Sequence, residues 1–143
     1  MAGRIAVASG LTDDSGWCPI HPVTFESIKH KNIHVIGDAA IAGAMPKSGF
    51  AANSQGKAVA ASIIAALNGR TASETIYVNT CYSLLAPDYG ISVAGVYRTG
   101  VDGIKEVPGS GGVSPNEADA GFRAAEAKYA SSWYANITAD VWG

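Results

Sequence analysis

The pattern of apolar positions along this chain changes near residue 70 and changes again near residue 114. A short apolar run closed by Gly37 predicts a buried strand over Asn32–Ile36. After a small-residue loop, the alanine-rich stretch from Ser48 to Leu67 predicts a long helix. Ser48 can N-cap it, and Asn68-Gly69 tolerate the left-handed conformation that ends helices. The second half of this helix is apolar nearly all round, so we expect it to be covered on more than one side.

Beyond residue 74 the period changes to two, with many Tyr, Val, Ile and Thr residues. The segments Thr75–Leu85 and Gly90–Arg98, separated by Pro87-Asp88, predict an antiparallel hairpin. Ile104–Val107 predicts a third short strand. The glycine-rich stretch Pro108–Pro115 reads as a connector rather than a dinucleotide-binding loop, because it lacks the required strand and third glycine.

A final helix is predicted to start at Ser114. Ser114 and Glu117 have capping-box spacing, and Pro115 suits the first helical position. Apolar residues then recur at helical spacing and predict the face that packs on the sheet: Ala118, Phe122, Ala125, Tyr129, Trp133 and Ile137. The second half of the chain is therefore expected to be an α+β unit, a small antiparallel sheet with a docked helix.

Composition and charge narrow the class of protein. Of the 143 residues, 48% are hydrophobic and 15% charged, which suits a cofactor-lined or interface-rich protein. The formal net charge of −2, without any Lys/Arg cluster, argues against a nucleic-acid partner. The longest apolar run, Ala58–Leu67, is too short for a membrane span. No Cys/His spacing resembles a metal site, so none is expected.

The segment from Ile33 to Gly69 carries the candidate cofactor chemistry. Asp38 follows the predicted strand, where its carboxylate can accept hydrogen bonds from ribityl or ribose hydroxyls or simply cap a turn. The helix start at Met45–Gly49 offers free N–H groups and favours negative charge. Because a reduced flavin is negative near its N1/O2 edge, this combination indicates a flavin site. Lys47 could add to that field or be a solvated surface lysine.

The two cysteines, Cys18 and Cys81, are most simply explained as structural residues. Cys81 would share a strand face with Tyr77 and Asn79. A lone cysteine in a strand is usually a small buried hydrophobe, and Cys18 is most simply a core residue. A disulfide between the two stays open at this point. Trp133 would by default be a core or interface aromatic.

Five segments closely resemble the flavoprotein subunit of flavocytochrome c sulfide dehydrogenase: DDSGWCPI, IGDAAIAGAMPKSGFAANSQGKA, NTCYSLLAPDYGISVAGVYR, SGGVSP and SWYANI. The resemblance covers essentially the whole chain and implies the C-terminal third of a longer, glutathione-reductase-like flavoprotein. It implies an α+β fold in which residues 1–70 are the last strand and helix of the FAD-binding domain. Residues 71–143 would be the C-terminal domain of the family, with the boundary at the composition shift Arg70–Glu74.

The resemblance also implies roles for individual residues. Asp38 would hydrogen-bond the FAD ribityl chain, and the helix start with Lys47 and Ser48 would face the flavin's pyrimidine edge. Cys81 would be one half of the redox-active disulfide that sulfide attacks, and Trp133 would lie near the flavin. The implied partner is a c-type cytochrome subunit in the periplasm, which receives the electrons. Cys18 does not match the disulfide partner of Cys81.

The family's second disulfide cysteine, its FAD-attached cysteine and its phosphate-binding glycines would lie in upstream sequence. We therefore expect this chain alone to bind FAD weakly and to be inactive, although its parent protein would be an enzyme. A fragment of a sulfide:quinone oxidoreductase and a non-catalytic binding or assembly module remain alternatives. The charged final helix, with no apolar tail after it, favours the cytochrome-coupled enzyme. Exposed apolar faces predict self-association, such as a homodimer burying the Ala-rich helix.

Overall fold

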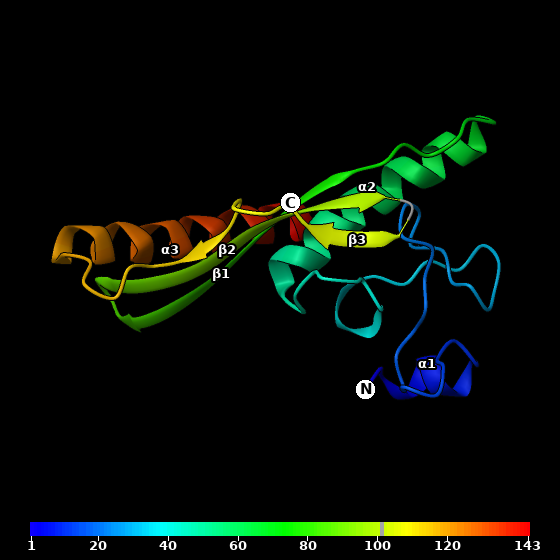
Figure 1. Ribbon diagram of the computed structural model, residues 1–143, viewed down its shortest axis with the longest axis horizontal. Helices are drawn as coiled ribbons and strands as arrows, with labels where there is room; N and C mark the ends of the chain where they lie inside the picture. The colour runs from blue at the N-terminus through cyan, green and yellow to red at the C-terminus, as the bar shows by residue number, and fades with distance from the viewer. Residues whose placement is uncertain (101) are drawn as a thin grey trace.

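The computed structural model describes residues 1–100 and 102–143, and it is an α+β structure (Figure 1). Its elements, in chain order, are helix α1 (Arg4–Ala8), the 3-10 turn η1 (Gly37–Ala39), helix α2 (Gly49–Leu67), strands β1 (Ile76–Ala86), β2 (Tyr89–Gly100), β3 (Gly103–Glu106) and β4 (Gly112–Val113), and helix α3 (Ala120–Trp142). The predicted fold class is confirmed: a small antiparallel sheet is followed by a C-terminal helix.

The sheet is built on one long hairpin. β1 and β2 pair antiparallel over nearly their whole length, with Tyr77 opposite Tyr97 and Cys81 opposite Val93. β3 pairs with the carboxyl end of β2, and β4 pairs with its middle. The predicted hairpin and third strand are confirmed. The glycine-rich connector also supplies β4, a two-residue strand that the sequence did not predict.

The hairpin extends well beyond the rest of the molecule. Its distal half and α3, which lies along it, form an arm, while α2, β3 and the N-terminal segment form the body (Figure 1). α3 lies very close to the sheet at Gly90, where an added Cβ would be 2.5 Å from the Ala127 nitrogen. This close approach requires a glycine in β2 and a small residue, Ala127, at the contact point on α3.

The hydrophobic core lies in the body, between α2, the proximal part of the sheet and the N-terminal loops. Phe25 and Tyr77 meet edge to face at 5.9 Å between ring centroids. The buried members of this core are Ile20, Phe25, Ala40, Ala42, Met45, Ala51, Val59, Tyr77, Tyr97 and Ile104. Burial of these side chains fixes α2 against β1, which determines where the start of α2 lies relative to the sheet.

The strand expected at Asn32–Ile36 does not form. His34 makes an isolated bridge with Glu26, and both Ile33 and Ile36 are 41% exposed. A strand needs a continuous hydrogen-bonding neighbour, and this segment has only the single bridge within the described residues. The turn at Gly37, by contrast, is present, with Gly37 at φ +69°.

The ends of α2 are as predicted, but its environment is not. The Ser48 hydroxyl accepts a hydrogen bond from the Ala51 N–H at 3.1 Å, and Gly69 adopts φ +65° after the helix. The second half of the helix is covered on one side only: Val59 and Ser62 are buried, whereas Ile64 is exposed and Leu67 is 82% exposed. The buried positions of α2 end at Ser62, and the last turn of the helix projects beyond the sheet (Figure 1).

The start and the buried face of α3 also differ from the prediction. The helix begins at Ala120, with Asp119 as N-cap, because the Asp119 carboxylate accepts from the Phe122 N–H at 2.8 Å. Ser114 instead donates to the Glu126 carboxylate at 2.5 Å, so it makes no capping box. Of the predicted stripe, Phe122 and Tyr129 are exposed, since the helix turns a buried Arg123–Glu126 pair toward the sheet.

Candidate functional site

The first turn of α2 lies beside Cys81 through a chain of hydrogen bonds. The Ser48 hydroxyl donates to Asn79 Oδ1 at 2.5 Å, and Asn79 Nδ2 donates to the Cys81 sulfur at 3.4 Å. Asn79 and Cys81 share one face of β1, as the two-residue period predicts. The structure therefore brings together two of the predicted site residues, Ser48 and Cys81, from segments more than thirty positions apart.

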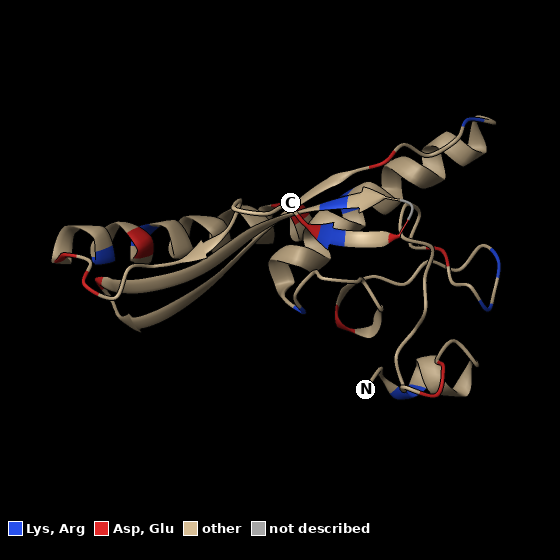
Figure 2. Ribbon diagram, in the orientation of Figure 1, with Lys and Arg blue, Asp and Glu red and all other residues tan. Residues whose placement is uncertain are grey.

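The face of the sheet that carries Cys81 is open in the arm. Across the sheet Cys81 pairs with Val93, which pairs in turn with Val113 on β4, and both valines are exposed. Charge is scarce here: β1 contains no charged residue and β2 contains only Arg98 (Figure 2). Cys81 itself is half-buried, so its sulfur lies at the border of a weakly charged, apolar surface.

Trp133 packs against the first turn of α2 from the other side of β1. Its ring stacks on Phe50 at 5.7 Å, with 11° between the planes, and lies 6.4 Å from the Tyr82 ring. Because Tyr82 and Cys81 are neighbours in a strand, their side chains point to opposite faces. Trp133 thus lies near the edge of β1 and on the face opposite Cys81, and the first turn of α2 contacts both faces.

The start of α2 has backbone N–H groups that are free to donate hydrogen bonds. Within the described part of the chain, the N–H groups of Gly49 and Phe50 have no hydrogen-bond acceptor, whereas those of Ala51 and Ala52 bond to Ser48. A groove of about 510 Å³ runs from Gly49 along α2 to the end of α3. Free N–H groups at the end of a 19-residue helix attract negative charge.

Asp38 lies in the turn η1, beside the second turn of α2. The N–H of Gly37 donates to Gln55 Oε1 at 2.7 Å, which fixes the turn against the helix. The Asp38 side chain is exposed and makes no hydrogen bond or ion pair with the described residues. Its carboxylate is therefore available to accept hydrogen bonds from outside the chain.

Lys47 contacts Trp17 and the turn that carries Asp38. Its ammonium lies 3.7 Å from the centroid of the Trp17 ring and donates to the backbone carbonyls of Asp38 and Ala40. These contacts make Lys47 a clamp on the turn that carries Asp38. Lys47 is an exposed residue whose ammonium is nevertheless held by these contacts, and its electrostatic contribution at the helix start remains a prediction.

Both cysteines are free thiols. Cys18 is fully buried, and burial raises the pKa of its thiol. Its backbone pairs with the turn at Ala39–Ile41, with the Ile41 N–H donating to the Cys18 carbonyl at 2.9 Å. The prediction of a core residue is confirmed for Cys18, which anchors the loop that carries Asp38.

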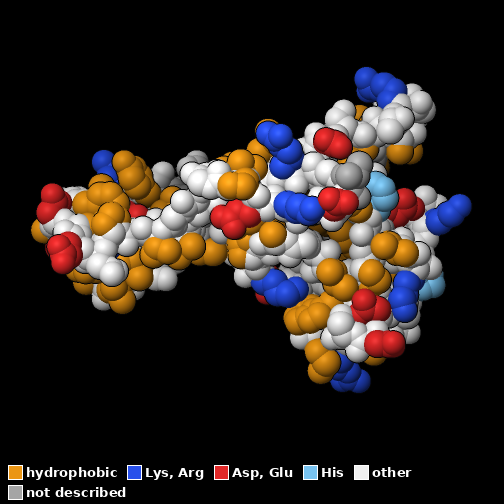
Figure 3. All heavy atoms as spheres, in the orientation of Figure 1, with side chains coloured by type: hydrophobic (Ala, Val, Ile, Leu, Met, Phe, Trp, Pro, Cys, Tyr) orange, Lys and Arg blue, Asp and Glu red, His pale blue; other side chains and the backbone are white. Residues whose placement is uncertain are grey.

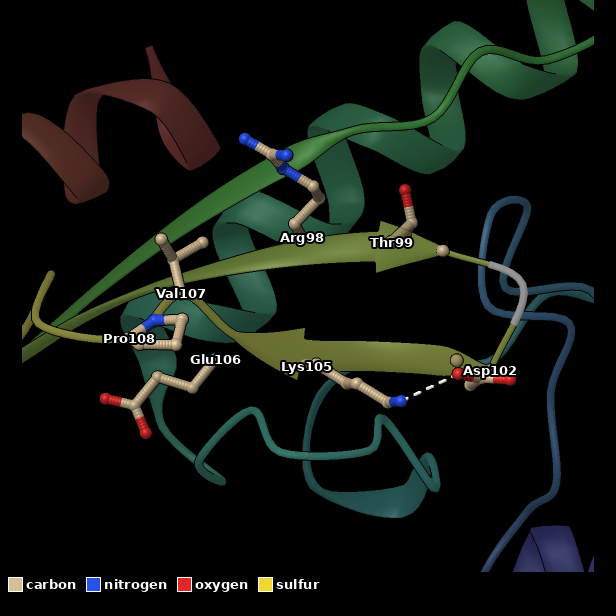
Figure 4. A pocket seen from close by; sticks show the side chains of 9 residues that line it. Arg98, Thr99, Asp102, Lys105, Glu106, Val107 and Pro108 are labelled. Atoms are coloured by element: carbon tan, nitrogen blue, oxygen red, sulfur yellow. Dashed lines mark hydrogen bonds and ion pairs between the residues drawn. The ribbon is translucent and has the colours of Figure 1, made fainter.

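A separate hollow of about 320 Å³ lies at the turn between β2 and β3 (Figure 4). Its ionic group is the pair between Lys105 and Asp102, 2.8 Å apart, which lowers the pKa of Asp102. In Figure 4 the Arg98 side chain points away from this pair. None of the residues with predicted cofactor chemistry lines the hollow, so we place the candidate site at the start of α2.

Comparison with known families identifies the second half of the chain. Residues 73–142 match the family model described as flavocytochrome c sulphide dehydrogenase, flavin-binding. The segment 73–142 belongs to this family. The flavin-binding segment includes Cys81 and Trp133, whereas Asp38, Lys47 and Ser48 lie outside the matched region. Since the family consists of flavin-binding domains, the match is consistent with FAD as the cofactor.

The residues around α2 fit a flavin. Gly49 and Phe50 offer N–H donors, Asp38 offers an acceptor, and Trp133 and Phe50 supply aromatic surface. Donors, an acceptor and flat apolar surface match the polar pyrimidine edge, the ribityl hydroxyls and the ring system of the cofactor. Among the described residues, no helix is long and apolar enough to cross a membrane, and no group of acidic, His and Cys side chains could hold a metal ion.

Sequence reasoning assigned no site role to three residues that build this site, Phe50, Asn79 and Tyr82. Phe50 and Tyr82 had no local signal, because their contacts with Trp133 exist only once α2, β1 and α3 are packed. Asn79 did have one, since it lies two positions before Cys81 in a strand and so shares its face. Its second contact, with Ser48, could not be predicted from the sequence.

Proposed function

We propose that this chain is the C-terminal part of a flavoprotein subunit that oxidises sulfide and passes the electrons to a c-type cytochrome in the periplasm. The observation that carries the proposal is the family match of residues 73–142, which contains Cys81. The contacts of α2 add support: its first turn touches Asn79, next to Cys81, and the ring of Trp133. In this proposal residues 1–70 complete an FAD-binding domain and residues 71–143 form the C-terminal domain.

In the proposed reaction Cys81 is one half of a disulfide whose other cysteine comes from the rest of the subunit. A hydrosulfide ion attacks this disulfide, a new S–S bond forms as the old one breaks, and one cysteine leaves as a thiolate. The persulfide and the thiolate together hold the two electrons removed from sulfide. Bound FAD supplies a two-electron acceptor. The apolar face around Cys81 is open in this chain. Once the rest of the subunit covers this face, it keeps water away from the reacting sulfur.

The other predicted residues hold and orient the cofactor in this proposal. Asp38 accepts from the ribityl hydroxyls, and Lys47 keeps the Asp38 turn in place through its two carbonyl contacts. Ser48 caps α2, which keeps the Gly49 and Phe50 N–H groups pointing outward toward the pyrimidine edge. Trp133 packs on Phe50 and provides aromatic surface beside the flavin ring.

Anaerobic reduction of the flavin by sulfide, followed in the complete subunit by stopped-flow absorbance, tests the role of Cys81. We expect Cys81→Ser to slow flavin reduction by at least about a hundredfold, because the attacked disulfide can no longer form. Ser83→Ala, two positions along the same strand face, is the matched control and should leave the rate unchanged. Unchanged reduction in Cys81→Ser would show that the proposed role is wrong.

Coupling to a quinone is a second candidate with a specific observation in its favour. Val141 and Trp142 are exposed in the last turn of α3, and Trp142 is 79% exposed. Exposed apolar groups at a helix end are typical of interfacial contacts. Reoxidation of the sulfide-reduced subunit by a c-type cytochrome, compared with a short-chain quinone, distinguishes the two acceptors.

A non-catalytic binding module would behave differently from both enzymes. FAD titration followed by flavin fluorescence should show weak or no binding by the 143-residue chain. Sulfide-dependent flavin reduction should appear in the complete subunit. A complete subunit that binds FAD but is not reduced by sulfide would favour the binding module.

We also propose that the isolated chain self-associates through the exposed second half of α2. Ile63, Ile64 and Leu67 form an apolar end of this helix, and other apolar side chains are visible along the arm and the body (Figure 3). Exposed apolar patches favour association. Light scattering should show a mass above 14.6 kDa that falls toward it in Leu67→Lys, whereas Asn68→Lys should have little effect. A clean monomer at high concentration would contradict this proposal.

A further inference from the structure

Asn79 is a buried amide with an unusual pair of partners. It is only 2% exposed, and its side chain links the N-cap of α2 to the sulfur of Cys81. A buried amide is costly unless both of its ends are hydrogen-bonded. Here Oδ1 is satisfied by Ser48, and within the described residues the acceptor for Nδ2 is the Cys81 sulfur.

The orientation of this amide is determined by the helix cap. The Ser48 hydroxyl oxygen accepts from the Ala51 N–H at 3.1 Å, so its own proton is free to be donated. It donates to Asn79 Oδ1 at 2.5 Å, which leaves the NH₂ group of Asn79 on the side of Cys81. The hydrogen bonds therefore run in one direction, from the α2 backbone through Ser48 and Asn79 to the sulfur.

The donor is better matched to a thiolate than to a thiol. A neutral thiol sulfur is a weak acceptor, whereas hydrogen bonds to a charged acceptor are about twice as strong as neutral ones. A hydrophobic side chain of similar size would serve a neutral cysteine equally well and would avoid burying an amide. The chain from α2 also carries the positive end of the helix dipole toward the sulfur.

We infer that Asn79 is a positioning residue, oriented by Ser48, that fixes the Cys81 sulfur and stabilises negative charge on it. This inference rests on the proposed function, in which Cys81 cycles between a disulfide and a thiolate. Asn79 itself does not touch sulfide or flavin in this role. Its contribution is to make Cys81 a better leaving group when the disulfide is attacked.

Alkylation of Cys81 by iodoacetamide in the 143-residue chain tests the inference without flavin or sulfide. Cys18 is replaced by Ala throughout, so that a single thiol reacts. Near pH 7 we expect Asn79→Leu to react about three- to fivefold more slowly, because the reacting sulfur loses the hydrogen bond from the Asn79 amide.

Three controls separate charge stabilisation from loss of structure. Thr99→Val, a buried polar residue on the same strand face as Tyr97, should leave the rate unchanged. Ser48→Ala should slow alkylation by a smaller factor, since the amide stays but loses its orienting donor, and Ser48→Thr should restore the rate. Circular dichroism confirms folding. If Asn79→Leu does not fold, the side-chain amide resonances of Asn79 in the unsubstituted protein should shift when Cys81 is alkylated.

Equal alkylation rates near pH 7 in folded Asn79→Leu and the parent chain would overturn the inference. If the side-chain amide resonances of Asn79 do not shift when Cys81 is alkylated, the inference is also overturned. These outcomes are distinguishable from failure of the proposed function, which is decided by sulfide-dependent flavin reduction in Cys81→Ser.

Discussion

Gly43 shows how a single residue places the loop that leads into α2. It adopts φ +61°, and an added Cβ would overlap the carbonyl oxygen of Ile104 on β3. The next residue, Ala44, donates its N–H to that same oxygen at 3.1 Å. The loop therefore lies directly on β3, and this contact helps to position Ser48 a few residues later.

We expect Gly43→Ala to destabilise the protein by roughly 3 kcal/mol or more, because it combines backbone strain with a steric clash. Gly69→Ala is the matched control, since Gly69 has φ +65° but open space around it. It should cost only about 1 kcal/mol, from the left-handed conformation alone. Chemical denaturation gives both values, and equal losses would show that the contact with Ile104 is not a constraint.

At the scale of elements, α3 is held to the arm by a buried polar cluster. Glu126 accepts from Ser92 and Ser114, each at 2.5 Å, and lies 4.0 Å from the Arg123 guanidinium. Arg123 also donates to the carbonyls of Pro115 and Asn116. These contacts connect α3 to β2 and to the segment before the helix, and so place Trp133 two turns further along.

Glu126→Ala should destabilise the protein by about 3–5 kcal/mol, because it leaves the Arg123 charge buried without its carboxylate partner. Glu117→Ala, at an exposed position shortly before the helix, should change stability by less than about 0.5 kcal/mol. The double variant Arg123→Met, Glu126→Leu should recover much of the loss. Thermal unfolding measures all three, and a neutral Glu126→Ala would mean that the cluster does not hold α3.

For the whole molecule, the buried tyrosines of the core predict a loss of stability in alkali. Burial raises the pKa of Tyr77 and of Tyr97 above the usual value of 10.0. Above about pH 10 the unfolded chain releases these protons while the folded protein retains them, so the free energy of unfolding falls as pH rises. Below that range both states are protonated, and the tyrosines contribute no slope.

Urea denaturation between about pH 8 and pH 11 tests this expectation. Each buried tyrosine can contribute a slope of at most about 1.4 kcal/mol per pH unit. Tyr77→Phe keeps the ring contact with Phe25 and should make the alkaline fall shallower. Tyr134→Phe, at an exposed position of α3, should not. Identical slopes in the parent and in Tyr77→Phe would contradict the assignment to Tyr77.

The hairpin, the third strand and the cap of α2 could be predicted because their signals are local. A two-residue period, a turn at Pro87-Asp88 and a serine before an alanine-rich run act within a few residues of themselves. The predictions of a strand at Asn32–Ile36 and of a helix start at Ser114 were wrong for the opposite reason. A strand depends on a neighbour supplied from elsewhere, and the polar group at Ser114 found a stronger partner in Glu126.

The sequence by itself determined the α+β class, the hairpin and the third strand, and it predicted roles for Asp38, Ser48, Cys81 and Trp133. Only the tertiary structure decided that Ser48 reaches Cys81 through Asn79, that Lys47 clamps the Asp38 turn, and that Trp133 lies on the opposite face of β1. The physical reason is the distance along the chain over which each interaction acts. Propensity, period and capping act along the chain, whereas a site at the start of α2 exists only after burial of the core has set the helix against the sheet.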